Sequence, residues 1–142
     1  MMKKTDLERA KNELNKGYTC VLIKNNSKHV SKRTGIAPMI NFLEKGIDLS
    51  SFSVADKIVG KAVALLFVKA KIKEVYAEVI SVEAIKILDL HNIKYSYKTK
   101  TENIINRTKT GICPMEQTVK DISDCETAYN ALRKKLSELK NH

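Results

Sequence analysis

Residues 54–68 read VADKIVGKAVALLFV, and from Ile58 onward nearly every side chain in this stretch is apolar. A helix on the surface of a globular protein needs one polar face, so a stretch that is apolar all round must be packed on both sides. The sequence therefore predicts that residues 54–68 form one helix in the centre of the core.

A strand, a helix and a second strand are predicted directly after this stretch. Residues 75–81 (VYAEVIS) and 93–98 (IKYSYK) are typical of strands, and residues 82–90 (VEAIKILDL) between them are typical of a helix. Two strands joined by a crossover helix lie parallel to each other. The sequence therefore indicates an α/β protein.

The residues before the central stretch predict a helix, a hairpin and a second helix. Thr5 and Glu8 have the spacing of a capping box, which starts a helix over residues 6–16. Residues 18–24 and 28–33 are expected to pair as a hairpin whose charged second strand lies at a sheet edge. A helix is expected over residues 36–45, with Pro38 near its start and Gly46 just past its end.

The C-terminal third predicts two more helices. Pro114 suits the first position of a short helix, and a second capping box at 123–126 starts an amphipathic helix that runs to about residue 139. We expect a three-layer α/β/α sandwich with a mixed sheet of about four strands. Residues 1–142 would form one domain, with a core at about 18–120 and a C-terminal helix at about 124–139.

The chain has 142 residues and a formal net charge of +10, from 26 lysines and arginines against 16 acidic residues. A basic chain suggests a polyanionic partner such as nucleic acid. Only four of the basic residues are arginine, and only residues 86–109 are locally rich in them. A solvated lysine surface is the favoured interpretation, and nucleic-acid binding is the alternative.

The three cysteines are widely spaced and form no CxxC pair, which is unlike a disulfide framework or a zinc site. The three histidines have no metal-ligand spacing either. The N-terminus lacks the apolar segment of a signal peptide, and no apolar stretch is long enough to cross a membrane. We expect a cytoplasmic protein without a membrane association or a metal site.

Charged residues at the start of the predicted core helix are the first candidates for a site. Asp56 and Lys57 lie in its first turn, and Lys61 lies one turn further on. A helix N-terminus and two lysines can bind an anion, while Asp56 accepts a hydrogen bond or transfers a proton. Alternatively, Asp56 only balances the helix dipole and the lysines extend to water. Ser81, at the carboxyl end of a predicted strand, is a further candidate.

The segment before the predicted helix at Pro114 supplies the second group of candidates. Cys113 is predicted as the N-cap and Glu116 as the third residue of that helix. A thiol at a helix N-terminus is a candidate nucleophile, although Cys113 can equally be a packing residue. Asn106 and Arg107 can orient a carboxylate or a phosphate, or can lie in an exposed loop.

Three stretches, VADKIVGKAVALL, VYAEVIS and NRTKTGICPMEQTV, resemble in order and spacing a prokaryotic family of unknown function, DUF1893. This resemblance covers about residues 22–119 and implies a cytidine deaminase-like fold. Zinc deaminases need H-x-E or C-x-E at one helix start and P-C-x-x-C at the next. This chain has Val54-Ala55-Asp56 and, at 81–85, SVEAI. We therefore expect no zinc and no other cofactor.

The function expected from this comparison is binding of a small anionic or nucleotide-like molecule at the start of the core helix, without a metal. Asp56 and Cys113 are the candidates for a catalytic step, if there is one. The remaining candidates for ligand binding are Lys57, Lys61, Ser81, Asn106, Arg107, Thr110 and Glu116. Two alternatives are an RNA-binding or ribosome-associated module that uses residues 86–109, and a structural protein that forms homo-oligomers.

Overall fold

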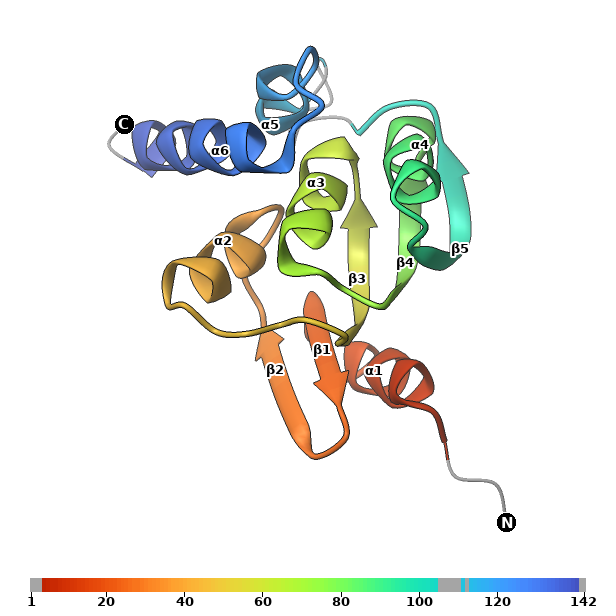
Figure 1. Ribbon diagram of the computed structural model, residues 1–142. Coiled ribbons are helices and arrows are strands. Elements are labelled where there is room, and N and C mark those ends of the chain that lie inside the picture. Colours follow the sequence, from red (N-terminus) through yellow and green to blue (C-terminus); the bar gives the residue numbers. More distant parts are fainter. Residues whose placement is uncertain (1–3, 105–110, 112, 141–142) are drawn as a thin grey trace.

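A computed structural model describes residues 4–104, 111 and 113–140 (Figure 1). Helices and strands alternate along most of the chain. In order, they are α1 (Asp6–Leu14), β1 (Cys20–Lys24), β2 (Ser27–Ser31), α2 (Ala37–Glu44), β3 (Ser53–Val59), α3 (Lys61–Ala70), β4 (Glu74–Ser81), α4 (Val82–Leu90), β5 (Lys94–Thr101), α5 (Pro114–Thr118) and α6 (Cys125–Lys140).

The strands form one five-stranded mixed sheet in the order β2-β1-β3-β4-β5. Strand β1 pairs antiparallel with β2 and with β3, placing Leu22 opposite His29 on one side and opposite Val54 on the other. Strands β3, β4 and β5 are parallel, and their register aligns Val54, Val75 and Tyr95. The predicted hairpin, its edge strand and the parallel strand–helix–strand unit are therefore confirmed.

The prediction of one helix over residues 54–68 is wrong in its first half. Residues Ser53–Val59 form β3, Gly60 is the N-cap, and the helix α3 starts only at Lys61. Strand β3 is the middle strand and has helices on both faces, so its apolar run lacks the alternation of a half-exposed strand. The spacing of apolar residues alone cannot distinguish such a strand from a buried helix. The sheet consequently has five strands rather than about four.

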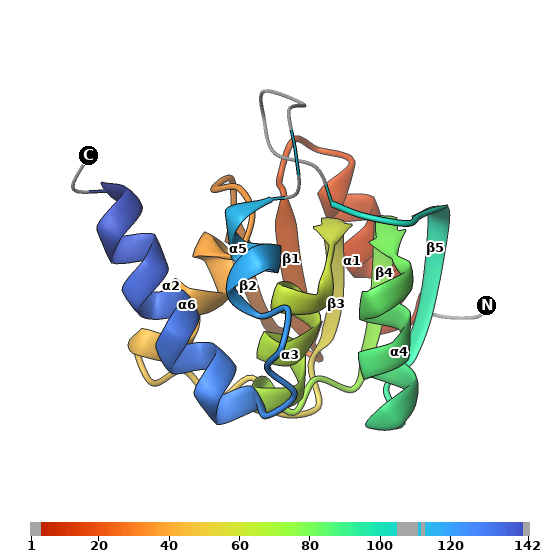
Figure 2. The ribbon, with the colours of Figure 1, turned by 90° about the horizontal axis from the view of Figure 1, so that it is seen from above.

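Helices cover both faces of the sheet (Figure 2). Helix α1 alone packs on one face, where its buried Ala10 and Leu14 contact Val21 of β1 and Ala55 of β3. Helices α2, α3 and α4 lie on the other face, and α6 packs against α3 on the side away from the sheet. The larger core lies between these helices and the sheet and includes Phe67, which is completely buried.

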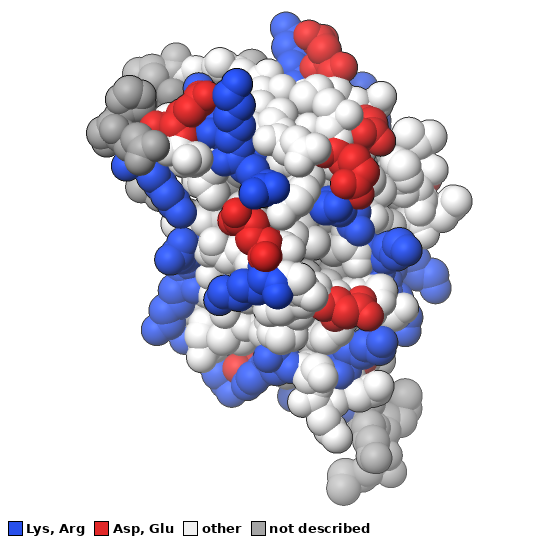
Figure 3. Space-filling view, turned by 60° about the vertical axis from the view of Figure 1, so that its left-hand side comes forward, with Lys and Arg blue, Asp and Glu red and all other residues white. Residues whose placement is uncertain are grey.

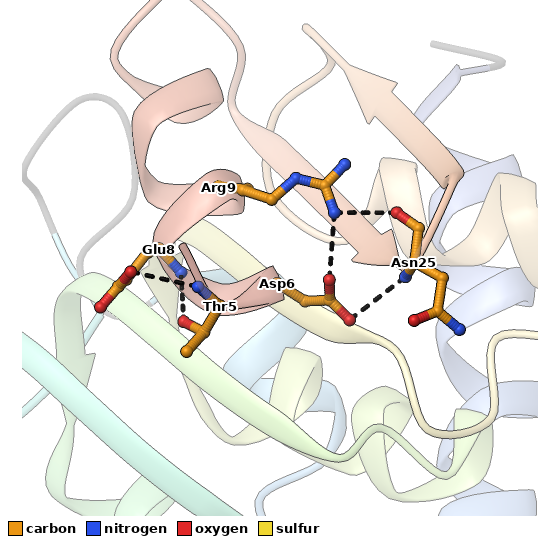
Figure 4. Close-up of polar contacts among 5 residues, drawn as sticks. All are labelled: Thr5, Asp6, Glu8, Arg9 and Asn25. Atoms are coloured by element: carbon orange, nitrogen blue, oxygen red, sulfur yellow. Dashed lines mark hydrogen bonds and ion pairs between the residues drawn. The ribbon is translucent and has the colours of Figure 1, made fainter. Parts of the chain in front are cut away.

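Helix α1 is joined to the turn of the β1–β2 hairpin by a polar cluster (Figure 4). The predicted capping box is present, because the Thr5 hydroxyl accepts from the Glu8 N–H and the Glu8 carboxylate accepts from the Thr5 N–H. Asp6 accepts from the Asn25 N–H at 3.2 Å, and Arg9 donates to the Asn25 carbonyl at 2.8 Å. These contacts fix the N-terminal helix on its face of the sheet.

The last helix begins close to the predicted position. The cap is supplied by Asp124, whose carboxylate accepts from the N–H of Thr127 at 2.8 Å. Within α6, Ala128, Tyr129 and Leu132 are buried, as expected for an amphipathic helix. Within the parts of the chain that the structure covers, no helix combines the length and the apolar character needed to cross a membrane.

Candidate functional site

The carboxyl ends of the three parallel strands meet the N-termini of α3 and α4 at one edge of the sheet, which is where ligands bind in many α/β proteins. A cavity of about 370 Å³ lies at this edge. Helix α5 and the residues that follow it form its opposite wall. The described lining residues are Lys61, Ser81, Glu83, Glu102, Asn103, Ile104, Glu116, Gln117, Lys120 and Asp121.

Glu116 of α5 caps the N-terminus of α3. Its two carboxylate oxygens accept from the backbone N–H groups of Lys61 and Ala62, each at 2.8 Å. Gly60, the N-cap residue of α3, has no side chain that could accept these hydrogen bonds. A helix N-terminus attracts negative charge, so the Glu116 carboxylate satisfies both the free donors and the helix dipole.

The cap requires glycine at position 60. A Cβ atom on Gly60 would lie 2.2 Å from Oε1 and 2.7 Å from Cδ of Glu116, and 2.8 Å from Cγ1 of Ile104. The φ of Gly60 is −102°, which any residue can adopt, so the requirement is steric. The glycine that the sequence places inside an apolar run therefore makes room for a carboxylate from a distant segment.

Burial raises the pKa of Glu116 above its usual value, because removal of water outweighs the two backbone hydrogen bonds and the attraction of Lys61. The negative charge of Glu83 adds to this increase. Glu116 and Ile104 also line a second, smaller cleft of about 50 Å³ on the side of Cys113. The Glu116 side chain thus lines both the cavity and the smaller cleft.

The N-terminus of α4 forms another part of the cavity wall. Ser81 is 2% exposed, and its hydroxyl caps α4 by accepting from the Ala84 N–H at 3.1 Å. Across the cavity, the Lys61 ammonium donates to the Lys120 carbonyl at 3.0 Å and joins α3 to the segment after α5. The cavity is therefore bounded by the capped N-termini of α3 and α4 and by the segment 116–120, which is held to α3 at Glu116 and Lys120.

Asp56 and Lys57 lie away from this cavity. They belong to β3, and the helix start on which their predicted role depended is at Lys61 instead. Lys57 forms an ion pair with Glu78 of β4 at 3.6 Å. Asp56 lies opposite Cys20 and is 5% exposed. Burial raises the pKa of Asp56 to about 8, although the N–H groups of Lys57 and Ile58 and the Cys20 thiol favour its ionised form.

The other predicted site residues have different outcomes. Lys61, Ser81 and Glu116 all line the cavity. Cys113 is the N-cap residue of α5 without a side-chain cap, and it lines the smaller cleft. The predictions for Asn106, Arg107 and Thr110 concern residues outside the described part of the chain.

Sequence reasoning missed all seven of the other described lining residues. Glu102, Asn103 and Ile104 follow β5, which extends to Thr101 rather than ending at residue 98 as predicted. The rule that sites lie at the carboxyl ends of parallel strands would have identified them from the correct strand end. No local pattern indicates Gln117, Lys120 or Asp121, because only the fold brings them to the cavity.

The residues that the structure describes do not fit a zinc centre. In the register that the structure defines, residues 60–64 at the start of α3 are GKAVA and residues 81–85 at the start of α4 are SVEAI, so neither helix start offers a histidine or a cysteine. Across the described residues, no group of three or more His, Cys, Asp or Glu side chains could hold a metal ion. No step of a reaction is therefore assigned to a metal.

Comparison with known proteins gives one family. The family model described as "Domain of unknown function (DUF1893)" matches residues 9–136. The chain is also similar to the crystal structure of a DUF1893 family protein from Thermotoga maritima, with 27% sequence identity and a TM-score of 0.83, over 94% of this chain and 92% of that chain. Among curated proteins, none matches this chain.

Proposed function

This chain belongs to the DUF1893 family, and from that premise we propose that it binds a small nucleotide-like molecule in the cavity at the carboxyl ends of β3, β4 and β5, without a zinc ion. The observation that carries the proposal is the cavity itself. A volume of about 370 Å³ lies within the range of small-molecule sites, and the cavity occupies the edge of the sheet at which α/β proteins bind ligands.

The choice of a nucleotide-like ligand rests on the cytidine deaminase-like fold that the resemblance to the DUF1893 family implies. We propose this deaminase-like classification of the fold as well, and a mixed sheet with helices on both faces supports it. The proposal concerns binding. Of the two candidates for a catalytic step, Asp56 lies away from the cavity, and Cys113 lines only the smaller cleft.

A thermal-shift screen with nucleobases, nucleosides and nucleotides tests the proposal. Asn103→Trp fills the cavity from an exposed position, and Asn130→Trp, on the exposed side of α6, is the matched control. A ligand present at 100 times its Kd stabilises the folded state by about 2.7 kcal/mol, which raises Tm by about 5 °C or more in a chain of this size.

We expect at least one compound to raise the Tm of the wild type and of Asn130→Trp but not of Asn103→Trp. The proposal is wrong if no compound in the screen stabilises the wild type. It is also wrong if Asn103→Trp responds as strongly as the control, because the ligand would then bind elsewhere.

Nucleic-acid binding is the second candidate, and the three exposed lysines of the edge strand β5, Lys94, Lys98 and Lys100, favour it. Other features weaken it. Lys86 forms an ion pair with Glu83 at 3.0 Å. Figure 3 brings forward the side of the molecule with α2 and α6, away from β5, and acidic and basic side chains are mixed there. Filter binding with all three lysines changed to Gln decides the matter: RNA binding through β5 predicts weaker retention and a smaller salt dependence.

The alternative of a homo-oligomer depended on polar groups at a helix start near Lys57. Because Lys57 lies on β3 and pairs with Glu78 of the same chain, no observation favours this alternative.

A further inference from the structure

The strongest position for an anion at the cavity is already occupied by the protein. At the N-terminus of α3, the Lys61 and Ala62 N–H groups both donate to the Glu116 carboxylate. Gly60 provides the space for that carboxylate, since any Cβ there would overlap it. A phosphate of a ligand would have to displace Glu116 before it could use these donors.

The second helix end at the cavity is also unfavourable for an anion. The hydroxyl of Ser81 accepts from the Ala84 N–H, so this donor of α4 is satisfied within the chain. Glu83, in the first turn of α4, also lines the cavity, and its carboxylate accepts from the Lys86 ammonium at 3.0 Å. The Glu83 charge opposes an anion at this helix end, and its ion pair with Lys86 reduces this repulsion.

The charged side chains that line the cavity are mostly acidic, which also disfavours an anionic ligand. Of the six ionisable residues among the described lining residues, four are acidic (Glu83, Glu102, Glu116 and Asp121) and two are basic (Lys61 and Lys120). The Lys61 ammonium already donates to the Lys120 carbonyl. Among the residues that the structure describes, no side-chain hydrogen bond or ion pair involves Glu102 or Asp121, so toward these residues their oxygens are available as acceptors.

From these three observations we infer that the cavity selects a small ligand that carries amino or hydroxyl donors and no phosphate, which means a nucleoside rather than a nucleotide. This inference rests on the proposed function and specifies its ligand. Glu102 and Asp121 accept from the donor groups of the ligand, and their charges disfavour an anion. The expectation of an anionic ligand assumed a free helix N-terminus at Asp56 and Lys57, and the actual N-terminus, at Lys61, is filled by Glu116.

Matched pairs of ligands that differ only in a phosphate test the inference. Adenosine and cytidine are compared with their 5′-monophosphates by isothermal titration calorimetry, with the wild type and a Glu102→Gln, Asp121→Asn double variant. The control is Glu138→Gln, which removes a negative charge from the exposed surface of α6. A single negative charge about 6 Å from each of two carboxylates loses about tenfold in affinity even in a water-like dielectric.

We expect a nucleoside to bind the wild type and Glu138→Gln about tenfold or more tightly than its monophosphate does. In the double variant this preference should shrink to less than about threefold. If the monophosphate binds as tightly as the nucleoside or more tightly, the inference is overturned while the proposed function stands. If neither binds, the inference fails, and the proposed function fails with it when the wider thermal-shift screen is also negative.

Discussion

Adding one methyl group at Gly60 should displace the Glu116 carboxylate from the N-terminus of α3 and so weaken the contact between α5 and α3. In Gly60→Ala, the new Cβ would lie 2.2 Å from Oε1 of Glu116, well inside van der Waals contact. Alanine adopts a φ of −102° without strain, so the cost arises from displacement of Glu116 and pressure on Ile104. The variant therefore measures the contact between α5 and α3.

The size of the effect follows from the contacts that are lost. Glu116 makes two hydrogen bonds of 2.8 Å to the N-terminus of α3. A hydrogen bond to a charged group contributes about 1.5–3 kcal/mol, and water from the adjoining cavity would replace part of this. Alanine is also a poorer N-cap than glycine by about 0.5–1 kcal/mol. We expect Gly60→Ala to lower the free energy of unfolding by about 3 kcal/mol.

A double-mutant cycle followed by urea unfolding separates this mechanism from a general packing defect. Glu116→Ala should cost about 2 kcal/mol, because it removes the same two hydrogen bonds. In that background, Gly60→Ala should cost only about 1 kcal/mol more, which gives a coupling of about 2 kcal/mol. Gly111→Ala is the control, because a Cβ there meets no atom within 4 Å. Additivity of the two variants within about 0.5 kcal/mol would refute the reasoning.

Four further predictions address other parts of the chain. Burial raises the pKa of Asp56 from 3.8 to about 8. Between these pH values the native state keeps a proton that the unfolded chain releases. The free energy of unfolding of the wild type therefore falls as pH rises, by at most about 1.4 kcal/mol per pH unit. Asp56→Asn should remove this slope in urea titrations, and parallel curves would contradict the assignment. Asp6→Ala should lower the free energy of unfolding by about 1 kcal/mol, through loss of the contact with Asn25, and an unchanged midpoint would show that the contact contributes nothing. Cys20 is 0% exposed, so Ellman's reagent should modify it only in denaturant. Cys125 is partly exposed and should react in the native state, but slowly, because burial and the charges of Glu126 and Asp124 raise its thiol pKa. Equal rates would be inconsistent with the fold. Elemental analysis should find zinc far below one ion per chain, and stoichiometric zinc would show that the residues assigned to the site are incomplete.

Local patterns predicted most of the fold. The capping box at Thr5 and Glu8, the hairpin and the strand–helix–strand unit depend on contacts between residues near in sequence, and all three are confirmed. The strand β3 was missed because a central strand with helices on both faces has no polar face, so its periodicity resembles that of a buried helix. Gly60 marks the true boundary, although an isolated glycine in an apolar run does not by itself distinguish the two.

The candidate site was predicted only in part. Ser81 was found because it follows a strand and caps a helix, and both features are local. Glu116 was found as a residue of the first turn of α5, but its hydrogen bonds go to α3, 54 and 55 positions away in the sequence. Contacts across such distances follow from the tertiary fold. For the same reason, residue spacing could not show that most of the charged lining residues are acidic, which is the observation that changes the expected charge of the ligand.

An NMR titration tests the central claim most directly: amide shifts of ¹⁵N-labelled protein are followed while the compound that gives the largest thermal shift is added. Binding in the cavity predicts that the largest changes cluster at Ser81, Asn103 and Lys120, which lie far apart in the sequence and line the same hollow. Changes confined to the lysines of β5, or scattered over the surface without a cluster at this edge of the sheet, would contradict the account.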